Sequence, residues 1–276
     1  MAFRRDNIAE AERNLRLAPG GLDLAAPGYA LFSGGHDSLC ATHVAMTNGY
    51  AQEVVHVNTG IGVDETREFV RATCAAHGWP LNELHPSVSY DELVVEHGFP
   101  GPAAHSFMYR RLKERALAAL ASERKLKRGA PFVYCSGVRK QESSRRMRGQ
   151  QQEWQHAPKL GWTWRAVILD WTKADCNRYI EAHGLARNPV VDLLHMSGEC
   201  LCGAFARPGE LNEIALWFPG TAARIAELEA RVRESGHPAC VWGQRPPSVH
   251  RNQLRFADDL MLCSSCVSKV LAEAAS

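Results

Sequence analysis

The sequence reads Leu31-Phe32-Ser33-Gly34-Gly35-His36-Asp37-Ser38 where an apolar run gives way to a polar turn. The run Gly28-Tyr29-Ala30 before it is typical of a buried strand, and residues 39–46 after it can continue as a helix. A strand, a tight glycine turn and a helix bring backbone amides and the positive end of a helix dipole to one point. This order predicts a site for a phosphate group.

Four residues of the turn are candidate phosphate contacts: Ser33, Gly34, Gly35 and Ser38. Asp37 is the exception, because a carboxylate repels a polyphosphate unless it caps the helix or holds a magnesium ion that bridges the two. The turn lacks the Lys of a Walker loop and the third Gly of the dinucleotide fingerprint. An ordinary strand-to-helix turn is the alternative explanation.

The chain downstream alternates strand and helix patterns. Residues 53–57 and 81–84 are predicted strands, and a helix with an acidic first turn is predicted between them, from Asp64 to His77. Alternation of this kind predicts an α/β fold with a doubly wound, mostly parallel sheet, whose ligands bind outside the carboxyl ends of the strands. Both glycine turns, at 34–35 and at Gly60, fall on that edge.

The turn resembles the PP-loop, Ser-Gly-Gly-x-Asp-Ser, of the ATP pyrophosphatase and adenine-nucleotide alpha-hydrolase-like superfamily. Later segments resemble motifs of its phosphoadenylyl-sulfate (PAPS) reductase branch, and together they cover roughly residues 29–195 in the expected order. They are Val57-Asn58-Thr59-Gly60 with Glu65-Thr66, where Asn58 replaces the usual Asp; His105 to Leu120; Val133 to Arg146, similar to Gly-x-Arg-x-x-Glu-Ser-x-x-Arg; and Asp170-Trp171-Thr172 with Asn188-Pro189.

The resemblance implies a Rossmann-like PP-loop domain that binds ATP or a related adenine nucleotide with magnesium. It implies nucleotide contacts beyond the turn, and catalytic roles for Asp37, Ser38 and Arg139. The additional contacts are Asn58, Thr59, Gly60, Gly137, Arg139, Ser143, Arg145 and Arg146. Guanidinium groups suit phosphate or sulfate oxygens, so the loop after residue 136 is expected to hold the far end of the substrate. Asp170 either caps a helix at Lys173, with Trp171 packed beneath it, or contacts the ligand.

The nine cysteines fall into two groups. Cys40, Cys74, Cys135 and Cys176 occupy apolar positions of predicted helices and a strand, so they are predicted to pack in the core. Cys200 and Cys202 lie in a polar glycine-flanked loop, and Cys263 and Cys266 form a Cys-x-x-Cys turn; together these four are predicted to hold a metal or cluster, with Cys240, beside His237, as a possible substitute. Four thiolates suit zinc or a [4Fe–4S] cluster equally. The resemblance favours the cluster, although the Cys-Cys pair of the cluster-bearing reductases is absent.

Composition indicates one large α/β domain with a smaller appendage. We predict an N-terminal helical arm over 1–28, which serves packing or a homodimer, a nucleotide-binding domain over 29–195 and a helical cap over 196–276. No apolar run approaches a membrane span and the opening residues lack a secretory signal, so the cytoplasm is expected. The net charge is only +2, but residues 110–148 carry thirteen Lys or Arg against three acids, which indicates a polyanionic partner or a solvated face.

The expected function is an AMP-forming step that activates an acceptor, a tRNA or DNA, for sulfur insertion, with a sulfur donor protein as a further partner. Sulfonucleotide (APS or PAPS) reduction is the alternative. The family supplies its mobile cysteine in a C-terminal Glu-Cys-Gly-x-His tail, and residues 269–276 do not show that sequence. A protein that binds nucleotide and a nucleic acid or protein partner without turnover is the third possibility.

Overall fold

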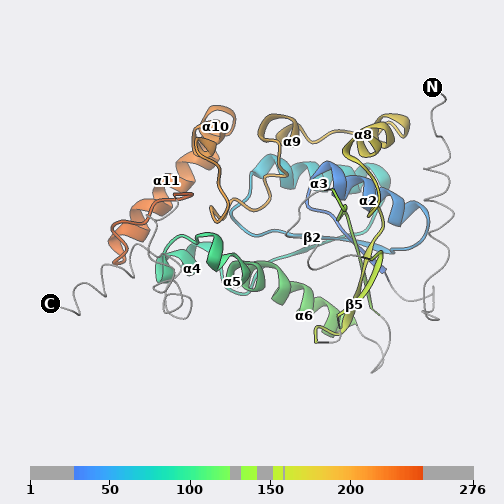
Figure 1. Ribbon diagram of the computed structural model, residues 1–276, viewed down its shortest axis with the longest axis horizontal. Coiled ribbons are helices and arrows are strands. Elements are labelled where there is room, and N and C mark those ends of the chain that lie inside the picture. Colours follow the sequence, from blue (N-terminus) through green and yellow to red (C-terminus); the bar gives the residue numbers. More distant parts are fainter. Residues whose placement is uncertain (1–27, 125–131, 142–151, 158, 245–276) are drawn as a thin grey trace. The chain divides into compact units, whose positions relative to one another are not determined.

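The computed structural model describes residues 28–124, 132–141, 152–157 and 159–244 of the chain (Figure 1). The predicted arm over 1–28, except Gly28, and the turn with Cys263 and Cys266 lie outside the described residues. The elements are β1 (Gly28–Leu31), α2 (His36–Thr47), β2 (Glu53–Val57), α3 (Asp64–His77), β3 (Leu81–Leu84), α4 (Tyr90–His97), a 3-10 turn (Pro102–Ala104), α5 (His105–Tyr109), a π-helical turn (Arg110–Glu114), α6 (Arg115–Arg124), β4 (Val133–Ser136), β5 (Trp154–Ala157), β6 (Trp162–Ala166), α8 (Lys173–Ala182), α9 (Pro189–Leu194), α10 (Glu210–Trp217) and α11 (Pro219–Glu234).

The described strands form one six-stranded sheet in the order β3-β2-β1-β4-β6-β5. Strand β1 pairs in parallel with β2 and with β4, and β4 pairs in parallel with β6. The edge strand β5 pairs antiparallel with β6. The predicted α/β class with a mostly parallel, doubly wound sheet is therefore confirmed. Strands β2 and β3 lie on one side of β1 and strand β4 lies on the other, so the strand order switches between β1 and β4. Ligands bind at such switch points.

The main core lies between the sheet and helices α2, α3 and α8, which cover one face, while α6 lies on the other (Figure 1). Four cysteines were predicted to pack there, and each is at most 2% exposed: Cys40, Cys74, Cys135 and Cys176. Trp171, 7% exposed, belongs to the same cluster, as predicted. Full burial of such side chains contributes about 1.5–3 kcal/mol each.

The described residues divide into two compact units that are not continuous in sequence. The first unit comprises residues 28–56, 68–83 and 118–191, and the second comprises residues 57–67, 84–117 and 192–244. The boundaries predicted from sequence, at residues 28 and 195, stay a prediction. Each unit is considered by itself below.

The segment from His105 to Leu120 is helical, and one π-helical turn at Arg110–Glu114 joins α5 to α6. One local expectation is wrong. Asp170 does not cap α8, because Thr172 caps it: the Thr172 side chain accepts from the Asp175 amide, and the Asp175 carboxylate accepts from the Thr172 amide. This capping box satisfies two orphan amides at the start of the helix, and Asp170 pairs with Lys140 instead.

Candidate functional site

The turn over Ser33–Ser38, here named the glycine loop, is closed by its own hydrogen bonds. The Ser38 hydroxyl donates to the Gly35 carbonyl oxygen over 2.8 Å, and the Ser33 amide donates to the Ser38 hydroxyl over 3.3 Å. Gly34 has a φ of 78°, a left-handed conformation that favours glycine. The Asn188 amide group donates to the Gly34 carbonyl oxygen over 2.8 Å and holds the turn from outside. These hydrogen bonds and the conformation of Gly34 therefore fix the bent shape of the loop.

Helix α2 begins directly after the loop, and its N-terminal backbone has no side-chain cap. Gly35 occupies the capping position with extended dihedral angles and no side-chain hydrogen bond. Asp37 lies two residues after Gly35, within the first turn of α2, so it is not the capping residue, contrary to one of its two expected roles. A helix start without a capping side chain leaves amide donors for an anion.

Asp37 instead receives two cationic side chains from other parts of the first unit. The Arg139 guanidinium donates to Oδ2 over 2.9 Å and the Lys173 ammonium donates to Oδ1 over 3.2 Å. Arg139 is almost buried, whereas half of the Lys173 side chain is exposed. Burial alone would raise the pKa of Asp37, but the Arg139 hydrogen bond and the charges of Lys173 and Arg139 outweigh it and hold that pKa below its ordinary value.

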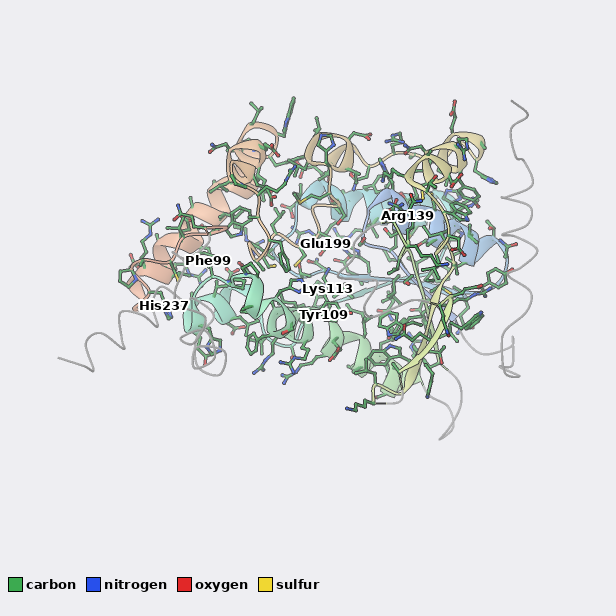
Figure 2. All side chains as sticks on the ribbon, viewed as in Figure 1. Phe99, Tyr109, Lys113, Arg139, Glu199 and His237 are labelled. Atoms are coloured by element: carbon green, nitrogen blue, oxygen red, sulfur yellow. The ribbon has the colours of Figure 1, made fainter. Side chains whose placement is uncertain are left out.

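The sheet order explains why Arg139 reaches Asp37. Strand β4 lies next to β1, so its carboxyl end emerges beside the glycine loop. Gly137 then passes so close to α2 that an added Cβ would lie 2.8 Å from the Asp37 carbonyl atoms and from the Ser38 nitrogen. Gly137, which was predicted as a nucleotide contact, therefore has a steric role: only glycine fits there. Two residues later comes Arg139, which is labelled in Figure 2, and its guanidinium donates to the Asp37 carboxylate.

Lys173 was not among the site residues predicted from sequence. It is the first residue of α8, which follows β6, and β6 lies next to β4 in the sheet. The available signal was the Asp170-Trp171-Thr172-Lys173 run itself, which places a Lys at the start of a helix. Ser143, Arg145 and Arg146, which were predicted to clamp the substrate, lie outside the described residues.

Asn58, Thr59 and Gly60 belong to the second unit, where internal hydrogen bonds engage them. The Asn58 side-chain oxygen accepts from the Gly60 amide over 3.0 Å and from Arg67 over 3.2 Å. The Thr59 amide donates to Glu199 Oε1 over 2.9 Å, and the Thr59 hydroxyl donates to the Glu199 carbonyl oxygen over 2.7 Å. A nucleotide contact by these three residues stays a prediction.

Glu199 lies in the loop Ser197–Gly203, which contains two of the predicted metal ligands and is here named the thiol loop. The Tyr90 hydroxyl donates to the Cys202 carbonyl oxygen over 3.0 Å and the Trp242 indole donates to the Leu201 carbonyl oxygen over 2.7 Å. A hydrogen bond from Cys202 lowers the pKa of the Cys200 thiol against the opposing effect of burial, and the Lys113 charge lowers it further. The hydrogen bond with Cys200 and burial raise the pKa of Cys202. The pair therefore favours the thiolate on Cys200 over the thiolate on Cys202.

Comparison with known proteins supplies the family. Residues 29–197 match the phosphoadenosine phosphosulfate reductase domain, which is more than half of the chain. The chain belongs to the phosphoadenosine phosphosulfate reductase family. The resemblance drawn from the five sequence segments is therefore confirmed.

Individual relatives are distant. An adenosine 5'-phosphosulfate reductase from Burkholderia cepacia is 24% identical over 186 residues, which cover 66% of this chain and 72% of that protein. Among solved structures, a phosphoadenylyl-sulfate reductase from Candida auris superposes with a TM-score of 0.47 at 16% identity, over 70% of this chain and 93% of that one. The U34-tRNA thiolase NcsA from Methanococcus maripaludis, solved with a [4Fe-4S] cluster, gives 0.44 at 14% identity, over 83% and 79%. The relatives named here are enzymes.

The metal ligands expected for a cluster are only partly within view. Cys200 and Cys202 offer two thiols in a loop fixed by backbone hydrogen bonds, and their partners Cys263 and Cys266 lie outside the described residues. Within residues 28–244, where described, no group of three or more His, Cys, Asp or Glu side chains is arranged to hold a metal ion. The four-cysteine site therefore stays a prediction.

The described residues of the basic stretch 110–148 are divided between the two units. Arg110, Arg111 and Lys113 lie in the second unit, whereas Arg139 and Lys140 lie in the first. Arg139 and Lys140 pair with Asp37 and Asp170, so they are engaged within the first unit. Among the described helices, none is long and apolar enough to span a lipid bilayer.

Proposed function

We propose that the first unit binds ATP or a closely related adenine nucleotide, with its phosphates on the glycine loop between Arg139 and Lys173. The observation that carries the proposal is the convergence of these two cations on Asp37, at the uncapped start of α2. An anion at that point would meet backbone amides, a guanidinium fork and an ammonium group together.

The ion pairs also suggest how the site exchanges partners. Asp37 pairs with both cations, and a bound phosphate chain would compete with it for them. Its carboxylate would then be available as an oxygen ligand for the magnesium ion that accompanies ATP, which screens the phosphate charge. The Ser136 hydroxyl, at the end of β4, is buried and has no hydrogen-bond partner among the described residues, so it is a further donor for the ligand.

The reaction we propose is AMP transfer. An oxygen of the acceptor attacks the α-phosphorus, the bond from that phosphorus to the bridging oxygen breaks, and pyrophosphate leaves with the electron pair. Arg139 and Lys173 would stabilise the negative charge that develops on the phosphate oxygens, which is a matter of positioning and electrostatics. A nucleic acid, tRNA or DNA, is the proposed acceptor, and the adenylated position is then open to displacement by sulfur from a donor protein.

Sulfonucleotide reduction is the second candidate. It is favoured by the family itself and by the adenosine 5'-phosphosulfate reductase among the relatives. In that reaction a cysteine thiolate attacks the sulfur of the sulfonucleotide, and the nucleotide leaves with the bridging oxygen.

Two assays on the full chain separate the candidates. AMP transfer predicts pyrophosphate release from magnesium ATP that requires added tRNA or DNA, whereas reduction predicts thioredoxin-dependent release of sulfite from APS or PAPS. Arg139→Ala should lower the active reaction about 100-fold or more, as loss of a charge-stabilising donor does. Lys140→Ala is the matched control, because Lys140 is adjacent in sequence but pairs with exposed Asp170. Full activity of the Arg139 variant would contradict the site in either reaction.

A further inference from the structure

Ser136 is a buried serine at the carboxyl end of β4, and the fold does not use its hydroxyl group. The residue is 7% exposed, and its hydroxyl oxygen has no hydrogen-bond partner among the described residues. The two serines of the glycine loop differ, because the Ser33 hydroxyl donates to the Ser38 hydroxyl over 3.2 Å and the Ser38 hydroxyl donates to the Gly35 carbonyl oxygen. A buried hydroxyl without a partner is unfavourable in a folded protein, so its presence requires an explanation.

Ser136 lies at the point where the strand order of the sheet switches. Strand β4 pairs with β1 on one side and with β6 on the other, and Ser136 lies opposite Ala166 of β6. The next residue, Gly137, approaches the first turn of α2 so closely that an added Cβ would lie 2.8 Å from the Ser38 nitrogen. Consecutive α-carbons are about 3.8 Å apart, so Ser136 is one residue away from contact with the start of α2.

The side chain of Ser136 lies on the face of the sheet that is turned away from α2. Val133 and Cys135 of β4 pack in the core cluster with residues of α2 and α8. Tyr134, between them in sequence, instead packs against Trp162, with ring centroids 5.5 Å apart. Since successive side chains of a strand point to opposite faces, Ser136 shares the face of Tyr134.

This position suits the half of a nucleotide that does not carry the phosphates. Leu31 and Ser33, at the end of β1, and Gly137 are partly exposed, so a ligand can reach the edge there. Ligands of such sheets lie across the carboxyl ends of the strands at the switch point. A nucleotide with its phosphates at the start of α2 would therefore extend its nucleoside across this edge, toward the face of Ser136. A hydroxyl can both donate and accept, as ribose hydroxyls and base nitrogens require.

We propose that Ser136 is a specificity-determining residue whose hydroxyl binds the nucleoside half of the nucleotide, while the glycine loop, Arg139 and Lys173 bind the phosphates. The inference rests on the proposed nucleotide site and divides that site into two parts. It accounts for a hydroxyl that is buried where the fold gives it no partner. Removal of this hydroxyl should weaken ligand binding without weakening the fold, because an unpaired buried hydroxyl does not stabilise the protein.

Calorimetric titration of the full chain with two ligands tests the division. Magnesium ATP has both halves, whereas magnesium tripolyphosphate has phosphates and no nucleoside. Ser136→Ala should bind magnesium ATP about three- to tenfold more weakly than the wild type, as loss of one uncharged hydrogen bond does, and should bind tripolyphosphate equally well. Ser136→Cys, with a weaker donor of similar shape, should resemble Ser136→Ala. Arg139→Ala should lose affinity for both ligands.

Thr42→Val is the matched control. Thr42 is 1% exposed, and its hydroxyl likewise has no hydrogen-bond partner among the described residues. It lies more than one turn beyond Asp37 along α2, so it is not part of the proposed ligand site. The variant should bind both ligands like the wild type. Chemical denaturation should show that neither Thr42→Val nor Ser136→Ala is less stable than the wild type.

The outcomes separate this inference from the proposed function. If Ser136→Ala binds both ligands like the wild type, the hydroxyl is not a ligand contact and only this inference fails. Equal loss of affinity for both ligands would mean that the hydroxyl contacts phosphate, and a less stable Ser136→Ala protein would mean that it serves the fold; either result overturns the inference. Wild-type protein that binds neither ligand would contradict the proposed function, and this inference with it.

Discussion

Asp37 is the residue on which the account of the nucleotide site turns. It is a negative charge at a position where we propose that polyphosphate binds, and it is tolerable there because Arg139 and Lys173 neutralise it. Its depressed pKa means that its contribution to folding stability is present above the unfolded-state pKa of about 4 and is lost as the pH falls below it.

Asp37→Asn should therefore affect the binding of free ATP and of magnesium ATP differently. Without magnesium, ATP should bind about three- to tenfold more tightly, because no carboxylate competes for Arg139 and Lys173 and a tenfold change is only 1.4 kcal/mol. With magnesium, the gain should disappear, because the variant lacks the proposed metal ligand. Titration of ATP into wild-type and variant protein, with magnesium and with EDTA, measures both. Equal changes under the two conditions would exclude a magnesium role for Asp37.

Gly137 gives a second prediction at this scale. Gly137→Ala puts a methyl group 2.8 Å from backbone atoms of Asp37 and Ser38, so the start of α2 must move. We expect a loss of about 1–3 kcal/mol in the free energy of unfolding, together with weaker nucleotide binding. Gly220→Ala is the control, because nothing lies within 4 Å of the added Cβ. Chemical denaturation of both variants decides, and an unchanged stability for Gly137→Ala would mean that the close approach is absent.

At the scale of elements, the sequence predicts a site residue only where a motif places that residue after a strand that lies beside β1. Arg139 was predicted because a motif placed it after β4, and β4 lies beside β1. Lys173 was missed because its position depends on β6 lying beside β4, and neither β5 nor β6 was predicted. Strands β5 and β6 contain Trp, Gln, His and Thr without a clear alternation of polar and apolar residues, and a short turn at Leu160 and Gly161 joins them.

Local chemistry explains the other differences. Asp170 and Thr172 are both good helix caps, and only the Asp175 carboxylate, three residues after Thr172, selects between them. The π-helical turn at Arg110–Glu114 shifts the helix register by about one residue, which a periodic apolar pattern does not specify. Helices α10 and α11 lie in the part of the chain predicted to be helical, 196–276.

The junction of α2, α3 and α8 contains a histidine that should respond to pH. His43 is 8% exposed, its Nδ1 lies 2.8 Å from the Tyr179 hydroxyl oxygen, and the rings of His77 and His183 lie within 6 Å. Burial first, and then the charges of His183 and His77, lower the pKa of His43 to about 4.

A lowered histidine pKa makes the unfolded chain the better proton acceptor. Stability should therefore be complete above pH 6.5 and fall by about 2–3 kcal/mol as the pH drops from 6.5 to 4. Denaturation midpoints across that range measure the slope. His43→Gln should flatten it, whereas His156→Gln, at an exposed position of β5, should not. The same slope in the His43 variant would show that other groups cause the pH dependence.

At the scale of the whole molecule, the candidate chemistry is distributed between the two units. The glycine loop, Arg139 and Lys173 belong to the first unit, and the thiol loop belongs to the second. Sequence motifs identified both regions, since a glycine turn and closely spaced cysteines are visible in one dimension. The interleaved composition of the units was not visible, because it depends on which distant segments pack together.

The central claim is that phosphate groups bind at the start of α2, and calorimetric titration of magnesium ATP into the intact chain tests it most directly. The account predicts measurable binding, at least tenfold weaker affinity for Gly35→Val and Arg139→Ala, and unchanged affinity for Lys140→Ala. Folded wild-type protein that gives no heat with any adenine nucleotide, or a Gly35→Val variant that binds like the wild type, would contradict it.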